Sequence, residues 1–318
     1  MTAEQINARL ERLMPVLTPL GIVLGFSLPG VFIHLRPLVP WLFGTMTLSG
    51  ALKLQAAEFG RTLRNPLPVL LFFVSVHIIM PLLALSAASL CFHSSADTVS
   101  GFVLLFSGPT AVSGFMWVSM YMGDKALCLA LILLDTLLAP LLVPGTISLL
   151  MGTKVTMDMG GIAVSLILMV VVPTVIGVTA NEVSRGKIPS RLCPYLNPVS
   201  KIFLMLVIAA NTAPAAPRIR LDEPRLWGIA ALCVVLSAVG FALARLSGIA
   251  GRCDTGRSIT LFFSGGLRNI SAVTTIAVTF FPEAAALPAL LGIVFQQSLS
   301  AVMARLLVRR QTSQGNTD

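Results

Sequence analysis

The sequence predicts an all-α integral membrane protein with ten transmembrane helices. Three observations support this fold class: an apolar composition, ten apolar runs separated by short polar segments, and matching interruptions in the fourth and ninth runs. Apolar residues make up 56% of the chain, charged residues make up 11%, and the mean hydropathy is +0.90. Soluble domains are about 45–50% apolar and about 25% charged. Lipid is therefore the solvent that this composition fits.

Each apolar run is close to the roughly 20 residues that a helix needs to cross the hydrocarbon core. The predicted spans are 16–33, 38–56, 66–91, 98–121, 126–151, 159–180, 196–213, 225–248, 257–281 and 284–307. The connections between them are short, including a polar one over 181–191, and none is long enough for a soluble domain. Residues 1–15 and 309–318 are predicted to be cytoplasmic terminal segments.

The basic residues predict the orientation. With the N-terminus inside, sixteen of the 22 Lys and Arg residues fall in cytoplasmic segments and one lies inside a span. The five in outer segments are Arg36, Lys154, Arg218, Arg220 and Arg225. Because Lys and Arg concentrate in cytoplasmic loops, both termini are predicted to be cytoplasmic. We expect a multi-pass protein of a cell membrane, most simply a bacterial inner membrane.

The two halves of the chain, 16–152 and 153–308, resemble one another. Ser107-Gly108-Pro109 interrupts the fourth span, and Ser264-Gly265-Gly266 interrupts the ninth. Since each half has five spans, the second copy would be inserted upside down. Paired interruptions at corresponding places point to a transporter site near the bilayer midplane. The alternative is that Gly and Pro are simply common in membrane helices.

Ionisable residues inside the membrane are costly and are expected to face the protein interior or water. Asp135 in the fifth span and Arg268 in the ninth lie near the midplane, and His77 in the third lies at similar depth. Asp135 and Arg268 either form a buried structural ion pair or place at least one charge on the solute pathway. Asp135 and His77 are the candidates for ion or proton coupling, although a neutral His77 could simply bond to a helix carbonyl.

The interruptions also supply candidate substrate ligands. Two glycines would let the backbone unwind before Arg268, and a half-helix starting at Arg268 or Asn269 would aim its positive end at an anion. The predicted substrate-binding residues are Arg268, Asn269, Ser264, Gly265, Gly266, Thr110, Ser113 and Phe115. Three further polar residues in the spans are expected to form interhelical hydrogen bonds or to contact solute: Asn211, Gln296 and Gln297.

At these residues the chain resembles the bile acid:sodium symporter family. The strings that carry the resemblance are Arg64-Asn65-Pro66, Gly108-Pro109-Thr110-Ala111, Gly123-Asp124, Asp135-Thr136-Leu137-Leu138-Ala139-Pro140-Leu141-Leu142-Val143-Pro144, Gly266-Leu267-Arg268-Asn269 and Pro282-Glu283-Ala284-Ala285. The resemblance implies two inverted five-span repeats, a panel domain and a core domain, and unwound spans four and nine that cross. It also implies symport of an organic anion with sodium.

The sodium ligands of that family are largely replaced in this chain. The family usually has Ser-Asn where this chain has Gly114-Phe115, and hydroxyl residues where it has Cys128 and Ile132. Its acidic ligand in span nine corresponds to Ser264, and a glutamine ligand corresponds to Arg268. A guanidinium has no acceptor for a cation. Transport is therefore expected to be sodium-independent or proton-linked, with Arg268 as a built-in cation; ordinary sodium coupling is the alternative.

The sequence favours a secondary transporter of a small organic anion over other classes of function. A non-transporting receptor or sensor is the alternative of another class. An enzyme is disfavoured because the spans carry no HExxH motif and no paired carboxylates. An ATP-driven pump is disfavoured because the sequence has no GxxxxGK[ST] nucleotide-binding motif. The expected partners are the anion and the lipid bilayer, with no nucleic acid and no obligatory protein partner. No cofactor is expected beyond Na⁺ or H⁺ as a coupling ion.

Overall fold

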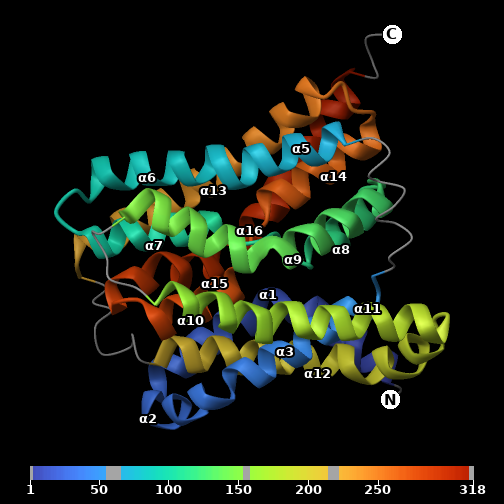
Figure 1. Cartoon of the computed structure of the whole chain (residues 1–318), viewed down its shortest axis with the longest axis horizontal. Coiled ribbons are helices and arrows are strands. Elements are labelled where there is room, and N and C mark those ends of the chain that lie inside the picture. The colour runs from blue at the N-terminus through green and yellow to red at the C-terminus, as the bar shows by residue number, and fades with distance from the viewer. Residues whose placement is uncertain (1–2, 55–65, 153–157, 214–221, 315–318) are drawn as a thin grey trace.

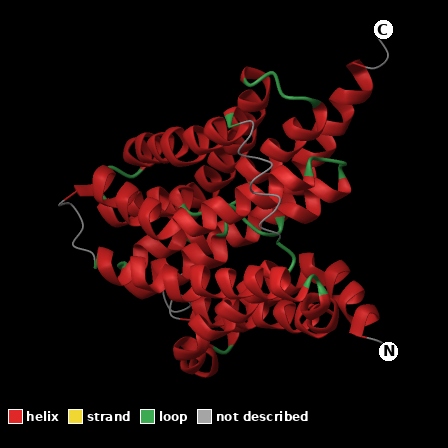
Figure 2. Cartoon of the chain, turned by 45° about the vertical axis from the view of Figure 1, so that its right-hand side comes forward, coloured by secondary structure: helices red, strands yellow, loops and turns green. Residues whose placement is uncertain are grey.

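The computed structural model describes residues 3–54, 66–152, 158–213 and 222–314. Helices joined by short loops make up this part of the chain, and no strand is present in it (Figure 2). Labels follow Figure 1. In chain order the elements are α1 (Ala3–Ser27), α2 (Pro29–Phe32), η1 (Ile33–Leu38), α3 (Val39–Ala51), α5 (Leu67–Phe73), η2 (Val74–Ile79), α6 (Met80–Cys91), α7 (Ala96–Ser107), α8 (Gly114–Met120), α9 (Lys125–Met151), α10 (Met159–Leu166), η4 (Ile167–Val171), α11 (Val172–Ser184), α12 (Lys187–Thr212), α13 (Pro224–Ala250), α14 (Thr255–Gly266), α15 (Ile270–Phe280) and α16 (Glu283–Gln314).

Six helical stretches are long and apolar enough to cross a membrane by themselves. They are Pro29–Ala51, Leu67–Cys91, Lys125–Met151, Met159–Ser184, Lys187–Thr212 and Pro224–Ala250. A seventh candidate is Ala284–Gln296 with Leu299–Leu306, which are bent by 50° relative to each other. Two shorter apolar helices are α7 and α15. The all-helical membrane class is therefore confirmed, with six to seven candidate spans in the described residues.

One predicted connection differs from the structure, and the described parts of both predicted terminal segments are helical. In the N-terminal segment 1–15 the described residues are helical, because α1 begins at Ala3. The predicted length of the polar connection over 181–191 is wrong, because only Arg185 and Gly186 separate α11 from α12. Gly186 has a φ of +82°, which allows this sharp reversal at little steric cost. The predicted tail 309–318 is also partly helical, since α16 continues to Gln314.

Some predicted features lie outside the described residues: Arg64 and Asn65 of the Arg-Asn-Pro string, Lys154, Arg218, Arg220 and the side chain of Gln297.

The helices form two groups that face each other (Figure 1). The first group, which we call the four-helix layer, contains α1, α3, α12 and the α10–η4–α11 helix. Its close packing follows from the sequence, because Gly21 and Gly25 lie four residues apart on α1. A Cβ on Gly25 would lie 2.5 Å from the carbonyl oxygen of Ala209 in α12. Small residues at this spacing let membrane helices approach closely.

The second group, which we call the crossing bundle, contains α5–η2–α6, α7, α8, α9, α13, α14, α15 and α16. The main buried apolar cluster lies mostly within it and includes Phe102, Ile147, Ile229 and Ile276. Several of its helices begin at a side-chain cap that satisfies a free backbone N–H. Asp124 accepts from the amide of Leu127 at α9, and Asp254 accepts from the amide of Arg257 at α14.

Candidate functional site

The two interrupted helices cross within the second group. The helix of the fourth predicted span stops at Ser107 and resumes at Gly114, and that of the ninth stops at Gly266 and resumes at Ile270. Both predicted breaks are therefore present. The extended segments pair as a short antiparallel bridge between Thr110 and Arg268. The amide of Asn269 donates to the carbonyl of Pro109 at 2.7 Å, and the amide of Ala111 donates to that of Leu267 at 3.2 Å.

The residues at the breaks explain why the helices stop there. Pro109 has no amide hydrogen, so it cannot continue the helical ladder. Gly108 allows close approach, because a Cβ at that position would lie 2.2 Å from a methyl group of Val273 in α15. Gly266 is equally constrained, because a Cβ there would lie 2.2 Å from the ring of Phe241. The Thr110 hydroxyl then ties the segments together by donating to the carbonyl of Ser264 at 2.5 Å.

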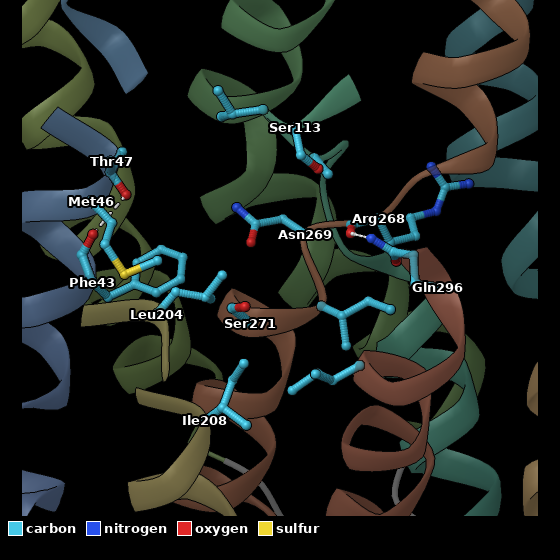
Figure 3. A pocket seen from close by; sticks show the side chains of 14 residues that line it. Phe43, Met46, Thr47, Ser113, Leu204, Ile208, Arg268, Asn269, Ser271 and Gln296 are labelled. Carbon is cyan, nitrogen blue, oxygen red and sulfur yellow. Dashed lines mark hydrogen bonds between the residues drawn. The ribbon is translucent and has the colours of Figure 1, made fainter. Parts of the chain in front are cut away.

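A cavity of ≈190 Å³ lies between the crossing and the four-helix layer (Figure 3). One wall is mainly apolar and comes from α3 and α12, with Phe43, Met46, Thr47, Leu204 and Ile208. The other wall comes from the two breaks and from α15 and α16, and its polar members are Ser113, Asn269, Ser271 and Gln296. The cavity thus combines an apolar face with hydroxyl and amide groups, which suits a small amphipathic solute.

Arg268 lies at the edge of this cavity with its backbone toward it. Its carbonyl oxygen accepts a hydrogen bond from the Gln296 amide at 2.9 Å. Its guanidinium points away from Asn269 and the α3 wall, toward the interior of the crossing bundle (Figure 3). The residue is only 3% exposed, and neither Nε nor Nη1 has a hydrogen-bond partner among the described residues. Arg268 therefore brings a buried positive charge to the crossing without placing that charge against the cavity's polar wall.

Asp135 is bonded to groups other than Arg268. Its Oδ1 lies 2.7 Å from Nε2 of His77, and its Oδ2 accepts the backbone amide of Thr110 at 2.7 Å. Within the described residues no ion pair joins Asp135 to Arg268. The direct Asp135–Arg268 pair considered from the sequence is therefore not formed. His77 is also bonded differently from the simplest expectation, because its partner is a carboxylate and not a helix carbonyl.

Comparison with known proteins identifies the family. The model of the sodium bile acid symporter family matches residues 40–219. The uncharacterized protein YbaS of Bacillus subtilis is 38% identical over 296 residues, which cover 93% of this chain and 97% of that protein. The chain belongs to the sodium bile acid symporter family.

Other relatives carry transporter names. The uncharacterized sodium-dependent transporter YocS of Bacillus subtilis is 23% identical, with 89% of this chain and 86% of that protein covered. The probable chloroplastic sodium/metabolite cotransporter BASS2 of rice is 26% identical, with 81% of this chain and 61% of that protein covered. Family membership and the apolar helices together make the chain a multi-pass membrane protein of a transporter family.

The positions that the family resemblance assigns to sodium ligands carry few oxygen-bearing side chains here. Cys128 of α9 and Ser264 of α14 face each other, with the thiol sulfur 3.6 Å from the hydroxyl oxygen. Cys128 and Ile132 are completely buried, and Phe115 packs against the same apolar cluster. Gly114 contributes no side chain there and lies near Leu267 and Phe263. A hard cation prefers several oxygen ligands, and these side chains supply one hydroxyl.

The predicted substrate-binding residues divide into two sets. Arg268, Asn269 and Ser113 line the cavity. The other five do not line it: Thr110, Ser264, Gly265, Gly266 and Phe115. Thr110 and Ser264 are bonded to each other within the crossing, and Gly265 packs against Ala244 of α13. Thr110, Ser264, Gly265 and Gly266 lie at or beside the crossing, and Phe115 packs against an apolar cluster from α8. Asn269 and Ser113 line the cavity, whereas Arg268 faces it with its backbone.

Two interhelical hydrogen bonds agree with the sequence. Asn211 of α12 donates to the Thr275 hydroxyl of α15 at 3.0 Å, and Gln296 of α16 donates to the Arg268 carbonyl. Gln296 also lines the cavity, as does Ser271, which the sequence does not single out. The sequence likewise does not predict the wall from α3 and α12. Its apolar residues cannot be distinguished from lipid-facing ones unless one knows that spans two and seven face the breaks.

Proposed function

We propose that this protein is a secondary transporter of a small organic anion, and that the positive charge of Arg268 takes the place of a coupling sodium ion. One observation carries the proposal. A buried guanidinium with no ion-pair partner among the described residues belongs to a residue that lines a small cavity. The family resemblance assigns this position to a sodium ligand. An arginine stays charged at physiological pH, so this positive charge does not depend on a bound sodium ion.

The surroundings of Arg268 favour an anion in the neighbouring cavity. The two oxygens of Asp135 are directed at His77 and at the Thr110 amide, so they do not form a direct pair with the guanidinium. The first turn of α15 also begins at the cavity, with Asn269 as its N-cap and Ser271 in its first turn. A helix N-terminus carries a partial positive charge. In this proposal Arg268 acts through space, and the Asn269, Ser271 and Ser113 side chains contact the anion.

The cavity supports a small substrate. Pockets for drug-sized ligands occupy roughly 300–1,000 Å³, whereas this cavity holds ≈190 Å³. The apolar wall formed by Phe43, Leu204 and Ile208 would cover an alkyl group, and the polar wall would hold a carboxylate. We therefore propose a short, branched organic acid as the substrate class.

The proposed architecture is ten spans in two inverted repeats, 16–152 and 153–308, with both termini in the cytoplasm of a bacterial inner membrane. The antiparallel bridge between the two breaks supports this arrangement, because inverted repeats would run in opposite directions where they cross. The first halves of both broken helices, α7 and α14, have twelve residues each. The distribution of Lys and Arg supports the orientation.

Ordinary sodium-coupled symport is the second candidate. The relatives YocS and BASS2 favour it, because the names of both describe sodium-dependent or sodium-coupled transport. Two features favour the sodium-independent proposal. The side chains around Cys128 supply only one hydroxyl group, that of Ser264, and an arginine occupies a position that the resemblance assigns to a sodium ligand.

Counterflow tests the proposal directly. Proteoliposomes loaded with an unlabelled short carboxylic acid are diluted into the same acid in radiolabelled form, using isobutyrate, pyruvate and 2-oxoisovalerate as probes. At least one probe should exchange without sodium. Arg268→Gln should weaken its apparent affinity about tenfold or more, because a unit charge is lost from a poorly screened site. Arg268→Lys should recover part of that loss. Exchange that is unaffected by Arg268→Gln would contradict the proposed role of this charge.

A further inference from the structure

We infer that His77 is a proton-binding site, and that one proton on its Nδ1 travels with the transported anion. This inference rests on the proposed function and adds the coupling ion to it. His77 lies in η2, a π-helical segment within the long third helical stretch. Such widened turns occur often at functional sites.

The hydrogen bonding of the imidazole identifies the atom that would receive the proton. We take Asp135 as a carboxylate, which can only accept, and therefore assign the Nε2–H tautomer to His77, whose Nε2 lies 2.7 Å from Oδ1 of Asp135. In a neutral imidazole the other nitrogen, Nδ1, then carries a lone pair. This atom is buried and has no hydrogen-bond partner among the described residues. A proton taken from the medium would bind at Nδ1, and the resulting imidazolium would keep its bond to the Asp135 carboxylate.

Few other ionisable groups surround this pair. Asp135 comes from α9, and Arg268 comes from the crossing segment. The packed helices α5 and α6 contain no Asp, Glu, Lys, Arg or further His. The remaining charged groups of the neighbouring helices lie nearer their ends: Asp97 of α7, Lys125 of α9, Arg225 and Arg245 of α13, and Arg257 of α14. His77, Asp135 and Arg268 therefore determine the charge at the centre of the bundle.

The charge balance explains why a proton and an anion would move together. Without the proton, Asp135 and Arg268 contribute opposite charges that cancel, so a bound monoanion leaves a net negative charge inside the membrane. With the proton on His77, the three groups sum to one positive charge, and the bound monoanion makes the assembly neutral. Buried net charge is costly in a membrane. Proton and anion should therefore strengthen each other's binding, as linkage requires.

The structure also connects the two sites through bonds. Oδ2 of Asp135 accepts the amide of Thr110 at 2.7 Å. Thr110 is bridged to Arg268, and the residues that follow Thr110, Ala111 to Ser113, line the cavity. A change of charge at His77 thus acts on a carboxylate that holds one wall of the cavity in place. The proposed step is only the binding of a proton to Nδ1 of His77 from one side of the membrane and its release to the other side.

The test uses the full-length protein in proteoliposomes with the membrane potential clamped at zero. An inward proton gradient should make the exchanging probe accumulate faster than in protein-free liposomes, where only the undissociated acid crosses. The limit is about tenfold for each pH unit, because one proton enters with each monoanion. His77→Gln keeps an N–H donor for Asp135 but cannot bind the proton. It should lose this accumulation while it retains measurable counterflow. His93→Gln, which changes an exposed histidine, is the matched control and should accumulate like the unmodified protein.

The outcomes separate this inference from the proposed function. Counterflow without pH-driven accumulation in the unmodified protein would overturn the proton site and leave the transporter intact. So would full accumulation by His77→Gln, which would show that the imidazole is only a structural donor. Absence of counterflow for every probe would overturn the proposed function and the inference with it. If His77→Gln does not fold, Asp135→Asn provides the second variant, and it too should lose accumulation more than counterflow.

Discussion

At the scale of single residues, the crossing depends on residues that lack a side chain or an amide hydrogen. Gly108 and Gly266 leave room for Val273 and for the Phe241 ring, and a Cβ at either position would lie 2.2 Å from those atoms. Pro109 contributes by lacking an amide hydrogen. The backbone groups released by the breaks then find partners in the other break or in Asp135. These backbone N–H and C=O groups thereby have hydrogen-bond partners within the protein, which matters because lipid tails offer none.

We predict that Gly266→Ala destabilises the protein by about 1–3 kcal/mol, because the new methyl group must displace the buried Phe241 ring. Thermal unfolding in detergent, followed by loss of the monodisperse peak in size-exclusion chromatography, measures this effect. Gly145→Ala is the control. Gly145 is a helical residue of α9, and no neighbouring atom lies within 4 Å of the place that a methyl group would take, so its replacement should be neutral or slightly stabilising. Equal melting temperatures for both variants would contradict the steric account.

At the scale of helices, α15 is one of the elements that join the two groups, together with the packing of α10 against α9. Arg36 of η1 donates from Nη2 to the carbonyl of Val278 at 3.1 Å, near the C-terminus of α15. One turn beyond the cavity residues Ser271 and Ile208, Asn211 donates to the Thr275 hydroxyl. The Asn211 bond runs between the four-helix layer and the crossing bundle, and the Arg36 bond ties η1, which packs against α12 and α3, to the same helix. A shift of α15 against α12 beyond hydrogen-bond distance would break the Asn211 bond.

We predict that Asn211→Ala loosens α15 against α12. A single interhelical hydrogen bond in a membrane protein contributes about 0.6 kcal/mol, so amide exchange over 275–280 should become about threefold faster. Hydrogen–deuterium exchange read by mass spectrometry measures this change. Ser49→Ala is the control, because the Ser49 hydroxyl bonds to Asn197 inside the four-helix layer at 3.2 Å. If Ser49→Ala accelerates exchange in α15 as much as Asn211→Ala does, the bond between the groups is not the cause.

The helix breaks could be predicted from the sequence, whereas the orientation of the side chains near them could not. Gly-Pro and Gly-Gly interruptions have local causes, so Ser107-Gly108-Pro109 and Ser264-Gly265-Gly266 indicate where helices stop. The depth of Arg268 also follows from its position in the apolar run. Its direction depends on which helices surround the break, and the guanidinium points away from the cavity. The apolar cavity wall from Phe43 to Thr47 escaped prediction for the same reason.

At the scale of the whole molecule, the two helix groups meet along a boundary that contains the cavity. The crossing places Arg268, Asp135 and His77 in the bundle on one side, and α3 and α12 complete the cavity from the other. A substrate in this cavity would contact both groups at once. Relative movement of the groups would then change the side to which it is exposed, as in other transporters with broken helices.

The orientation of the whole molecule gives a separate prediction. A reporter fused after Asp318 should be cytoplasmic, and an epitope tag inserted near Asp222 should be accessible from outside intact cells. The reason is the excess of Lys and Arg in the segments assigned to the cytoplasm. Accessibility of both positions from the same side would contradict either the ten-span count or the inverted repeat.

The most direct test of the central claim is the sodium dependence of uptake. The initial rate of uptake of an exchanging organic acid is measured in proteoliposomes with sodium outside, and again with sodium replaced by potassium or by choline. If the positive charge of Arg268 takes the place of a coupling sodium ion, the three rates should agree within error. A steep rise of the rate with sodium concentration in the unmodified protein would contradict this account and would make it an ordinary sodium-coupled symporter.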